Sequence, residues 1–351
     1  MLIEGVFAAV TTPFYPDERV YYRKLEANVA RYSRSQLAGM VVLGSTGEAP
    51  ALNDAETRDV LRTAVEAAAA EKVLIAGVNR ESLHAVLELA ETAAHFQYDA
   101  VLVRTPTYYS TQMTPSVVEN YFRAIADRSP LPVVLYNIPR CVPYQIPVEM
   151  VAELAHHPNI IAIKDSSGSL DCIKGIVEAT RGVTRRTVTV TPVFEAVTAR
   201  MLNAAVTLPA TFVSAGDLAG GPAIAVAPPA TPLKTRSREV GFQVLTGSAA
   251  NILASLEAGA SGAILGFAAC APEACYEVYF AWKDRDAKLA ADKQSSVATP
   301  NQKIVAEMGI AGVKYACDFN GYYGGYPRQP LLPLTSEQKA AVEELLAEIR
   351  N

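Results

Sequence analysis

The sequence contains few of the residues that bind metals or form disulfides. Its five cysteines are odd in number and include no pair at the two-residue spacing of a zinc or redox site. Among its four histidines no two stand at helical ligand spacing, and the adjacent His156 and His157 precede Pro158, as at the end of a helix. We therefore expect no metal and no cofactor, and we expect the cysteines to be small core residues.

Basic clusters and long apolar runs are also lacking. The formal net charge is -5, and no group of Lys and Arg with interleaved aromatic residues occurs, which argues against a nucleic-acid partner. Residues 201–216 come nearest to a membrane span, but Asn203, Thr207 and Pro209 interrupt them, so we expect no membrane segment. Residues 1–7 carry an acid and no arginine, unlike a secretory or mitochondrial leader, and we expect a cytoplasmic protein.

What the chain does contain is a recurring pattern of short strands and helices. Segments rich in Ala, Glu and Leu with helical periodicity, such as Asp54–Ala70, separate most of eight β-rich runs. The eight runs are Val6–Val10, Met40–Leu43, Val73–Ala76, Ala100–Val103, Pro132–Tyr136, Ile160–Lys164, Gln243–Thr246 and Gly262–Leu265. Eight strands alternating with helices at about thirty residues per unit predict an α/β fold, a (β/α)8 TIM barrel, rather than a doubly wound sheet. The barrel should close near Gly266, which gives a barrel domain of residues 1–267.

Two stretches do not follow the alternation. Residues 182–238 are rich in Thr, Ala, Val and Pro without a strong period, which predicts an insertion, either a flexible excursion or a small appended subdomain. It follows a helix and precedes the next strand, so it should emerge at the N-terminal face of the barrel, opposite the active-site end. Residues 268–351 show helical patterns at 272–291, 295–308 and 336–350, which predict a C-terminal α-helical extension.

Lys164 is the most informative single residue. It ends the apolar run Ile160–Ile163 and is followed by Asp165-Ser166-Ser167-Gly168, as in a strand that is covered on both faces. Burial of an ammonium group at the mouth of such a sheet favours the free amine, which can attack a carbonyl carbon. Lys164 is then either a Schiff-base lysine or a lysine that caps the strand and extends to water.

The ends of other predicted strands carry residues able to serve the same reaction. Active sites of (β/α)8 barrels lie at the C-terminal ends of several strands. An iminium between Lys164 and a 2-oxo acid would be an electron sink for a neighbouring carbanion, and the Tyr136 phenol could move the required proton. In the turn Gly44–Glu48, which leads into a helix near Asn53, backbone N–H groups and the Ser45 and Thr46 hydroxyls could hold a carboxylate.

Each of these elements also has a structural interpretation. Gly-Ser-Thr-Gly is a common strand-to-helix turn, and a buried tyrosine such as Tyr136 is often a packing residue. Tyr108 and Tyr109 could form an aromatic surface patch, and Asp165 could simply pair with a charge. The occurrence of turn, tyrosine and lysine together on one predicted rim favours an active site.

Four motifs in this order resemble the dihydrodipicolinate synthase and N-acetylneuraminate lyase group of pyruvate-type class I aldolases. They are Gly44–Glu48, Thr105-Pro106 with Tyr108-Tyr109, Leu135–Pro139 and Ile161–Asp165, and the resemblance covers nearly the whole chain apart from the insertion. It implies that Lys164 is the Schiff-base lysine and Tyr136 the proton-relay phenol. It further implies that the turn Ser45-Thr46-Gly47 holds the carboxylate and supplies relay hydroxyls. Tyr109 matches the tyrosine that completes the relay from a neighbouring subunit, which implies a dimer or a homotetramer.

Other residues bear on the branch of this family. The synthases of lysine biosynthesis carry an arginine five residues after the relay tyrosine, where this chain has Cys141, with Arg140 one residue earlier. Ser166 matches the 4-hydroxy-2-oxoglutarate aldolases and related 2-keto-3-deoxy sugar acid aldolases. The same branch is matched by C-terminal motifs at residues 242–249, which include Gly247 and Ser248, and at 300–301, 309–314 and 321–325.

The expected substrate-binding set therefore combines the turn Ser45–Gly47 with Arg140, Ser166, Gly247 and Ser248. The expected reaction is cleavage of 4-hydroxy-2-oxoglutarate to pyruvate and glyoxylate. Cleavage of a 2-keto-3-deoxy sugar acid and synthesis of dihydrodipicolinate are the alternatives. A barrel that only binds 2-oxo acids is a further one, against which the complete catalytic motifs argue.

Overall fold

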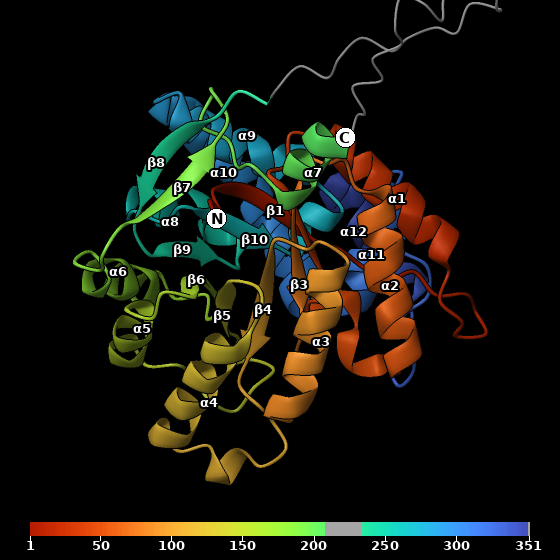
Figure 1. Ribbon diagram of the computed structural model, residues 1–351. Helices are drawn as coiled ribbons and strands as arrows, with labels where there is room; N and C mark the ends of the chain where they lie inside the picture. Colours follow the sequence, from red (N-terminus) through yellow and green to blue (C-terminus); the bar gives the residue numbers. More distant parts are fainter. Residues whose placement is uncertain (208–232, 350–351) are drawn as a thin grey trace, which may run out of the picture.

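The computed structural model describes residues 1–207 and 233–349, and eight parallel strands form a closed barrel in them (Figure 1). The strands follow one another around the barrel in the order β1, β10, β9, β6, β5, β4, β3, β2. They are β1 Gly5–Ala9, β2 Gly39–Val42, β3 Val73–Gly77, β4 Ala100–Arg104, β5 Val133–Asn137, β6 Ile160–Asp165, β9 Gln243–Thr246 and β10 Gly262–Leu265. Each overlaps one of the eight predicted runs, and the predicted (β/α)8 barrel is confirmed.

Helices on the outer side of the barrel bury one apolar face each. Helix α2, for example, begins with a capping box in which Asn53 and Glu56 exchange side-chain and backbone hydrogen bonds, and it buries Val60, Leu61 and Ala64. The barrel helices are α1 Tyr22–Arg34, α2 Asp54–Ala67, α3 Leu83–His95, α4 Pro115–Arg128, α5 Val148–Ala155, α6 Leu170–Ala179 and α8 Ile252–Glu257.

Strand alternation separates the barrel interior from the layer between strands and helices. On β5, Val133 and Leu135 pack in the large cluster that includes the helices, whereas Val134 and Tyr136 belong to a second cluster with the alternate residues of the other strands. Because side chains of a strand point to opposite faces in turn, this second cluster fills the barrel interior. Tyr136 therefore stands at the top of the packed interior.

The C-terminal region is helical, as predicted, although its helix boundaries differ. Its helices are α9 Pro272–Lys283, α10 Ala287–Pro300, the π-helix η6 Asn301–Glu307, α11 Gly309–Phe319 and α12 Ser336–Leu346. The predicted helix 272–291 is interrupted at Arg285, whose φ of 64° is left-handed. The predicted helix 295–308 changes to a π-helix after Pro300, which lacks the N–H that an α-helix needs there. Helix α11 was not predicted.

The described part of the predicted insertion contributes a two-stranded antiparallel sheet, β7 Arg186–Val190 with β8 Arg236–Val240, and the helix α7 Ala199–Thr207. This sheet lies beside the start of the chain (Figure 1). Val188 and Val190 pack against Leu2. Residues 208–232, which make up much of the expected insertion, lie outside the described residues.

Two arginines attach this part to the N-terminal ends of barrel strands. Arg186 donates hydrogen bonds to the carbonyls of His157 at 2.8 Å and Ile160 at 2.8 Å, just where β6 begins. Arg200 donates to the carbonyl of Lys72, directly before β3, and to that of Ala69 at 3.2 Å. The carbonyls of His157 and Ala69 also accept from the N–H groups of Ile160 and Lys72, so the arginines add further donors where β6 and β3 begin. The attachment is at the N-terminal face, the end of the barrel away from Lys164.

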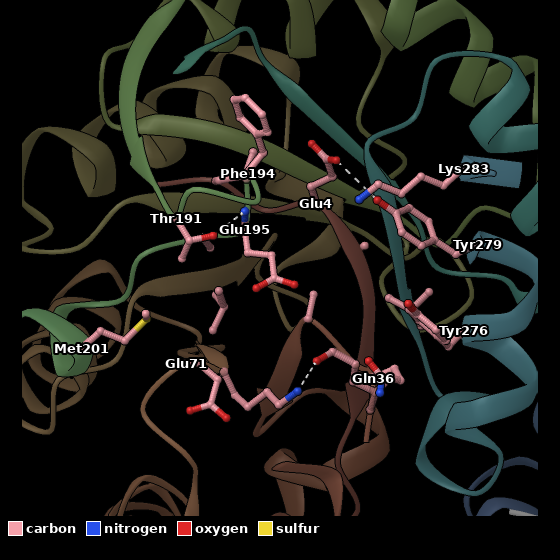
Figure 2. Close-up of a pocket in the computed structure, with 18 residues that line it drawn as sticks. Glu4, Gln36, Glu71, Thr191, Phe194, Glu195, Met201, Tyr276, Tyr279 and Lys283 are labelled. Atoms are coloured by element: carbon pink, nitrogen blue, oxygen red, sulfur yellow. Dashed lines mark hydrogen bonds between the residues drawn. The ribbon is translucent and has the colours of Figure 1, made fainter. Parts of the chain in front are cut away.

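A cavity of about 180 Å³ lies between this part and the barrel (Figure 2). In Figure 2, Thr191 and Glu195 lie across the cavity from Tyr276 and Tyr279 of α9. Tyr279 Oη donates to Glu4 at 3.4 Å. The cavity thus lies at the N-terminal face of the barrel, and none of the predicted site residues lines it.

The sequence also predicts that the cysteines are core residues and that no segment crosses a membrane. Four of the five cysteines are buried, but Cys141 is exposed, so the expectation of a core residue is wrong there. The residue lies in the turn after β5, where the chain runs over the surface. In the part of the chain that the structure describes, no helix has the length and apolar character needed to cross a bilayer.

Arg200→Ala should lower stability without affecting chemistry at Lys164. Arg200 is 9% exposed in its side chain and lies 3.8 Å from the carboxylate of Asp99, which is 2% exposed. Burial raises the pKa of Asp99. Removal of the arginine leaves that carboxylate buried without its charge partner, and we expect a loss of about 3 kcal/mol in the free energy of unfolding, measured by urea denaturation. Arg181→Ala, which removes an exposed pair with Glu178, is the control and should cost under about 1 kcal/mol. Equal losses in the two variants would contradict this account.

Candidate active site

Lys164 lies at the C-terminal end of β6 and is 4% exposed. The parallel register of β5 and β6 pairs Tyr136 with Lys164 directly. Lys164 Nζ donates a hydrogen bond to Tyr136 Oη at 3.3 Å, and it lies 4.3 Å from the centroid of the Tyr136 ring. The amine and the phenol, 28 residues apart in the sequence, therefore meet inside the barrel mouth. Lys164 does not extend to water, which was its other interpretation.

The turn after β2 brings a hydroxyl to the same pair. Residues Ser45–Gly47 form a 3-10 helix, and Ser45 Oγ lies 3.4 Å from Tyr136 Oη. Thr12 Oγ1 donates to the carbonyl of Gly47 at 2.7 Å, which fixes the end of the turn. Ser45, Tyr136 and Lys164 thus form a continuous chain of polar contacts from three strand ends.

Thr46 faces the last strand of the barrel. A methyl group added at Gly266, just after β10, would lie 3.3 Å from Thr46 Oγ1. Gly266 therefore leaves space for the turn to approach the strand ends closely. The structure places Thr46 at the mouth but does not place its hydroxyl against Tyr136, unlike that of Ser45.

Asp165 is held by neutral donors rather than by a charge. The residue is 2% exposed, Asn137 Nδ2 donates to its Oδ1 at 2.6 Å, and Ser167 Oγ donates to its Oδ2 at 2.6 Å. Asn137 Oδ1 in turn accepts from the backbone N–H of Ile146 at 3.1 Å. Asn137 and Asp165 directly follow Tyr136 and Lys164, so their bond ties together the two strand ends that carry the amine and the phenol. Sequence reasoning did not identify Asn137, although its place after Tyr136 was a signal.

Ser166 and Gly247 pack against one another at the neighbouring strand ends of β6 and β9. A Cβ on Gly247 would lie 1.9 Å from Ser166 Oγ, so only glycine fits there. Gly247 N–H donates to the carbonyl of Asp165 at 2.6 Å. Ser248 N–H donates to Thr246 Oγ1 at 3.3 Å and starts the turn that follows. These three predicted binding residues therefore form one rim segment beside Lys164.

Arg140 occupies the outer edge of the site. It is exposed, and its Nη2 donates to the carbonyl of Ala306 in the π-helix η6 at 2.7 Å. Arginine has five N–H donors, and this bond uses one of them. Arg140 thus connects the turn after β5 to the C-terminal region, and the structure shows it on this region rather than on Lys164.

Tyr109 lies away from the Lys164 pair within the single chain. Tyr108 and Tyr109 are 80% and 60% exposed, and their rings contact edge to face with centroids 5.1 Å apart. Glu81 holds the loop by accepting from the N–H groups of Thr107 and Tyr108 at 2.8 Å and 3.0 Å. Burial acts to raise the pKa of Glu81, but these bonds and Arg104 lower it to about 2. The loop therefore presents two aromatic side chains to solvent in a fixed conformation.

The side chains at the barrel mouth indicate what chemistry they can support. In residues 1–207 and 233–349, no group of three or more His, Cys, Asp and Glu side chains is arranged to hold a metal ion. The groups that meet at the mouth are an amine, a phenol and a hydroxyl. Such a set can form an imine with a carbonyl compound and move a proton next to it.

Comparison with known proteins finds relatives that match nearly the whole chain. The dihydrodipicolinate synthetase family model matches residues 2–189 and 231–349, and the unmatched residues between them fall inside the predicted insertion. The chain is 29% identical over 350 residues to an L-threo-3-deoxy-hexylosonate aldolase of Hypocrea jecorina, across 98% of this chain and 95% of that protein. It is 29% identical over 344 residues to a 4-hydroxy-tetrahydrodipicolinate synthase of Acidiphilium cryptum, across 97% and 96% of the two chains.

Solved structures share the fold. A prophage protein of the dihydrodipicolinic acid synthase family from E. coli K12, solved in complex with pyruvate, superimposes with a TM-score of 0.78 at 21% identity and 99% coverage of both chains. A protein described as a dihydrodipicolinate synthase family member from Coccidioides immitis gives a TM-score of 0.73 at 23% identity, across 99% of this chain and 95% of that one. The family match over most of the sequence, with the named relatives, shows that the chain belongs to the dihydrodipicolinate synthetase family and is an enzyme of the aldolase and lyase type.

Proposed function

We propose that the protein is a Schiff-base aldolase that cleaves 4-hydroxy-2-oxoglutarate to pyruvate and glyoxylate. The observation that carries the proposal is the buried contact of Lys164 Nζ with Tyr136 Oη at 3.3 Å, with Ser45 Oγ 3.4 Å from the same phenol. An imine-forming amine needs a proton carrier within hydrogen-bond reach, and this pair provides both.

The proposed reaction begins with attack of the Lys164 amine on the 2-oxo carbon. Loss of water gives an iminium, which withdraws electrons from the adjacent C3–C4 bond. Tyr136 donates its proton to the departing water and, as the phenolate, then accepts the proton of the C4 hydroxyl as that bond breaks. Glyoxylate leaves, and the electron pair of the broken bond remains as an enamine. Protonation of the enamine and addition of water to the iminium release pyruvate and restore the amine.

The turn Ser45–Gly47 is proposed to hold the C1 carboxylate. It lies at the barrel mouth next to Tyr136, and its N–H groups and hydroxyls can donate to a carboxylate without a counter-cation. Burial of Lys164 and Tyr136, at 4% and 2% exposure, keeps water away from the iminium and strengthens these polar interactions. Ser166, Gly247 and Ser248 would line the opposite rim, where the aldehyde half of the substrate would lie.

The choice of aldehyde is proposed to depend on Arg140. Its guanidinium is fixed to Ala306 at the mouth and can bind the second carboxylate of 4-hydroxy-2-oxoglutarate with its other donors. Cleavage of a 2-keto-3-deoxy sugar acid is the second candidate, favoured by the similarity to the Hypocrea jecorina aldolase. Dihydrodipicolinate synthesis is the third, and the position of Arg140 one residue early argues against it.

A panel of substrates tests this assignment. We expect a higher kcat/KM for cleavage of 4-hydroxy-2-oxoglutarate or a 2-keto-3-deoxy sugar acid than for condensation of pyruvate with aspartate semialdehyde. Arg140→Ala should raise KM for acidic aldehydes by about tenfold or more, the effect of a lost charge-assisted bond, and leave pyruvate trapping at Lys164 intact. Arg123→Ala, which breaks a surface pair with Glu119, is the control. Efficient condensation with aspartate semialdehyde without cleavage of either acid would restore the synthase assignment.

We also propose that the protein is an oligomer and that it has a barrel unit and a helical unit. Exposed Tyr109 on its ordered loop is suited to enter the mouth of a neighbouring barrel, which would require at least a dimer and fits a homotetramer. Residues 1–267 would form the barrel unit around the 182–238 insertion, and 268–351 the helical unit. The cytoplasmic location stays a prediction.

A further inference from the structure

A buried ion pair joins the substrate turn to the C-terminal region. Lys314 Nζ, from helix α11, lies 2.5 Å from Glu48 Oε1, and the side chains are 1% and 3% exposed. Glu48 directly follows the turn Ser45–Gly47. The free energy needed to remove two charges from water can exceed the free energy of their attraction, so a buried ion pair is a weak source of stability. Its presence next to a proposed substrate-binding turn requires another explanation.

Each of the two charges has further partners besides the other. Lys314 Nζ also donates to the carbonyl of Tyr326 at 2.6 Å and lies 4.3 Å from the centroid of the Phe14 ring. Glu48 Oε2 accepts from the backbone N–H of Arg328 at 2.8 Å. Each charge therefore has its ionic partner and a further backbone partner, which limits both side chains to one position.

The backbone of Glu48 shows why its side chain affects the turn. Glu48 has a φ of 53°, in the left-handed region that non-glycine residues avoid, and it ends the 3-10 helix Ser45–Gly47. Its N–H donates to the carbonyl of Ser45 at 3.1 Å, and its carbonyl accepts from the N–H of Ala51 at 2.8 Å. A conformation of this kind costs about 1 kcal/mol or more and persists when surrounding contacts enforce it. Besides these two backbone bonds, the side chain of Glu48 is held by Lys314 and by the N–H of Arg328.

We propose that Glu48 and Lys314 are a positioning pair that sets the geometry of the Ser45–Gly47 turn for the carboxylate of the 2-oxo acid. The inference rests on the proposed function of that turn. Neither residue contacts the substrate, and each acts through the turn. The C-terminal helical region is then part of the substrate-binding apparatus, because the residue that holds the turn lies 266 positions later in the chain than Glu48.

The test separates positioning from stability by comparing two buried pairs. Glu48→Gln keeps the shape but removes the charge, so the turn loses the attraction of Lys314. We expect KM for the 2-oxo acid to rise by about tenfold or more, with a smaller change in kcat and with borohydride trapping at Lys164 retained at saturating pyruvate. Asp99→Asn removes the carboxylate of the buried pair at the opposite barrel end and is the matched control. It should lower the melting temperature and leave KM unchanged.

A double variant distinguishes a loss of folding stability from a loss of positioning. Glu48→Gln combined with Lys314→Met leaves no unpaired buried charge, so this double variant should recover most of the stability that Glu48→Gln loses. Its KM for the 2-oxo acid should stay high, because no ion pair holds the turn. If folded Glu48→Gln or the folded double variant has a KM for pyruvate within twofold of the wild type, the positioning role is wrong and the proposed function is unaffected. Failure of the wild-type protein to trap pyruvate at Lys164 would instead overturn the proposed function and this inference together.

Discussion

Replacement of Lys164 by alanine should abolish turnover and covalent trapping of pyruvate. Lys164 Nζ is the amine that lies buried beside Tyr136, and no imine can form without it. Borohydride added with pyruvate should inactivate the wild-type protein and add the mass of reduced pyruvate to the peptide that contains Lys164. Mass spectrometry of the digested protein measures this directly, and the alanine variant should show no added mass.

Lys174→Ala provides the matched control for this result. Lys174 lies on α6, in the same βα unit, and it is exposed. Its removal should change neither turnover nor labelling. Labelling of a different lysine, or inactivation without added mass, would rule out the covalent mechanism at Lys164. Activity should also survive a chelator, because the iminium supplies the electron sink that other aldolases obtain from a divalent ion.

Tyr136→Phe should lower kcat by about two orders of magnitude or more while the fold persists. The change removes one hydroxyl, which contacts Lys164 Nζ at 3.3 Å and Ser45 Oγ at 3.4 Å, and leaves the ring in the packed interior. Because the amine remains, pyruvate trapping should persist at a lower rate. Steady-state kinetics and a trapping time course separate the two effects.

A second buried tyrosine distinguishes proton transfer from packing. Tyr98 Oη donates to the carbonyl of Leu61 at 2.9 Å and is also buried. Tyr98→Phe should cost about 1 kcal/mol of stability, the usual contribution of one hydrogen bond, and leave kcat unchanged. Unchanged kcat in Tyr136→Phe would return Tyr136 to the packing interpretation that the sequence left open.

The two ends of the barrel have separate roles in this account. The predicted site residues lie at the C-terminal ends of the strands, and the described part of the insertion lies at the N-terminal ends. Arg186 and Arg200 donate to carbonyls there, so this part adds hydrogen bonds to the N-terminal ends of β6 and β3. Changes at that face should therefore affect stability rather than the chemistry at Lys164.

Local patterns were sufficient for the barrel and for the central pair. A strand buried on both faces reads as a continuous apolar run, and eight such runs could be counted along the chain. Parallel strands place their C-terminal ends at one rim, so Tyr136 at the end of one strand and Lys164 at the end of the next had to be neighbours. The capped start of α2 at Asn53 was visible for the same reason, since a cap depends on residues within one turn.

Contacts between distant segments were decided by the tertiary structure. Nothing near Glu48 indicates that Lys314 neutralises it, because that contact depends on how α11 packs against the turn. Arg140 could be identified as a candidate, but only the path of η6 determined that it would bond Ala306. The break at Arg285 and the π-helix after Pro300 likewise follow from packing of the C-terminal helices. The sequence by itself determined the barrel, the lysine and the phenol, because periodicity and strand ends are local properties. The tertiary structure decided what holds the substrate turn and the outer rim, because those bonds join residues that no local pattern relates.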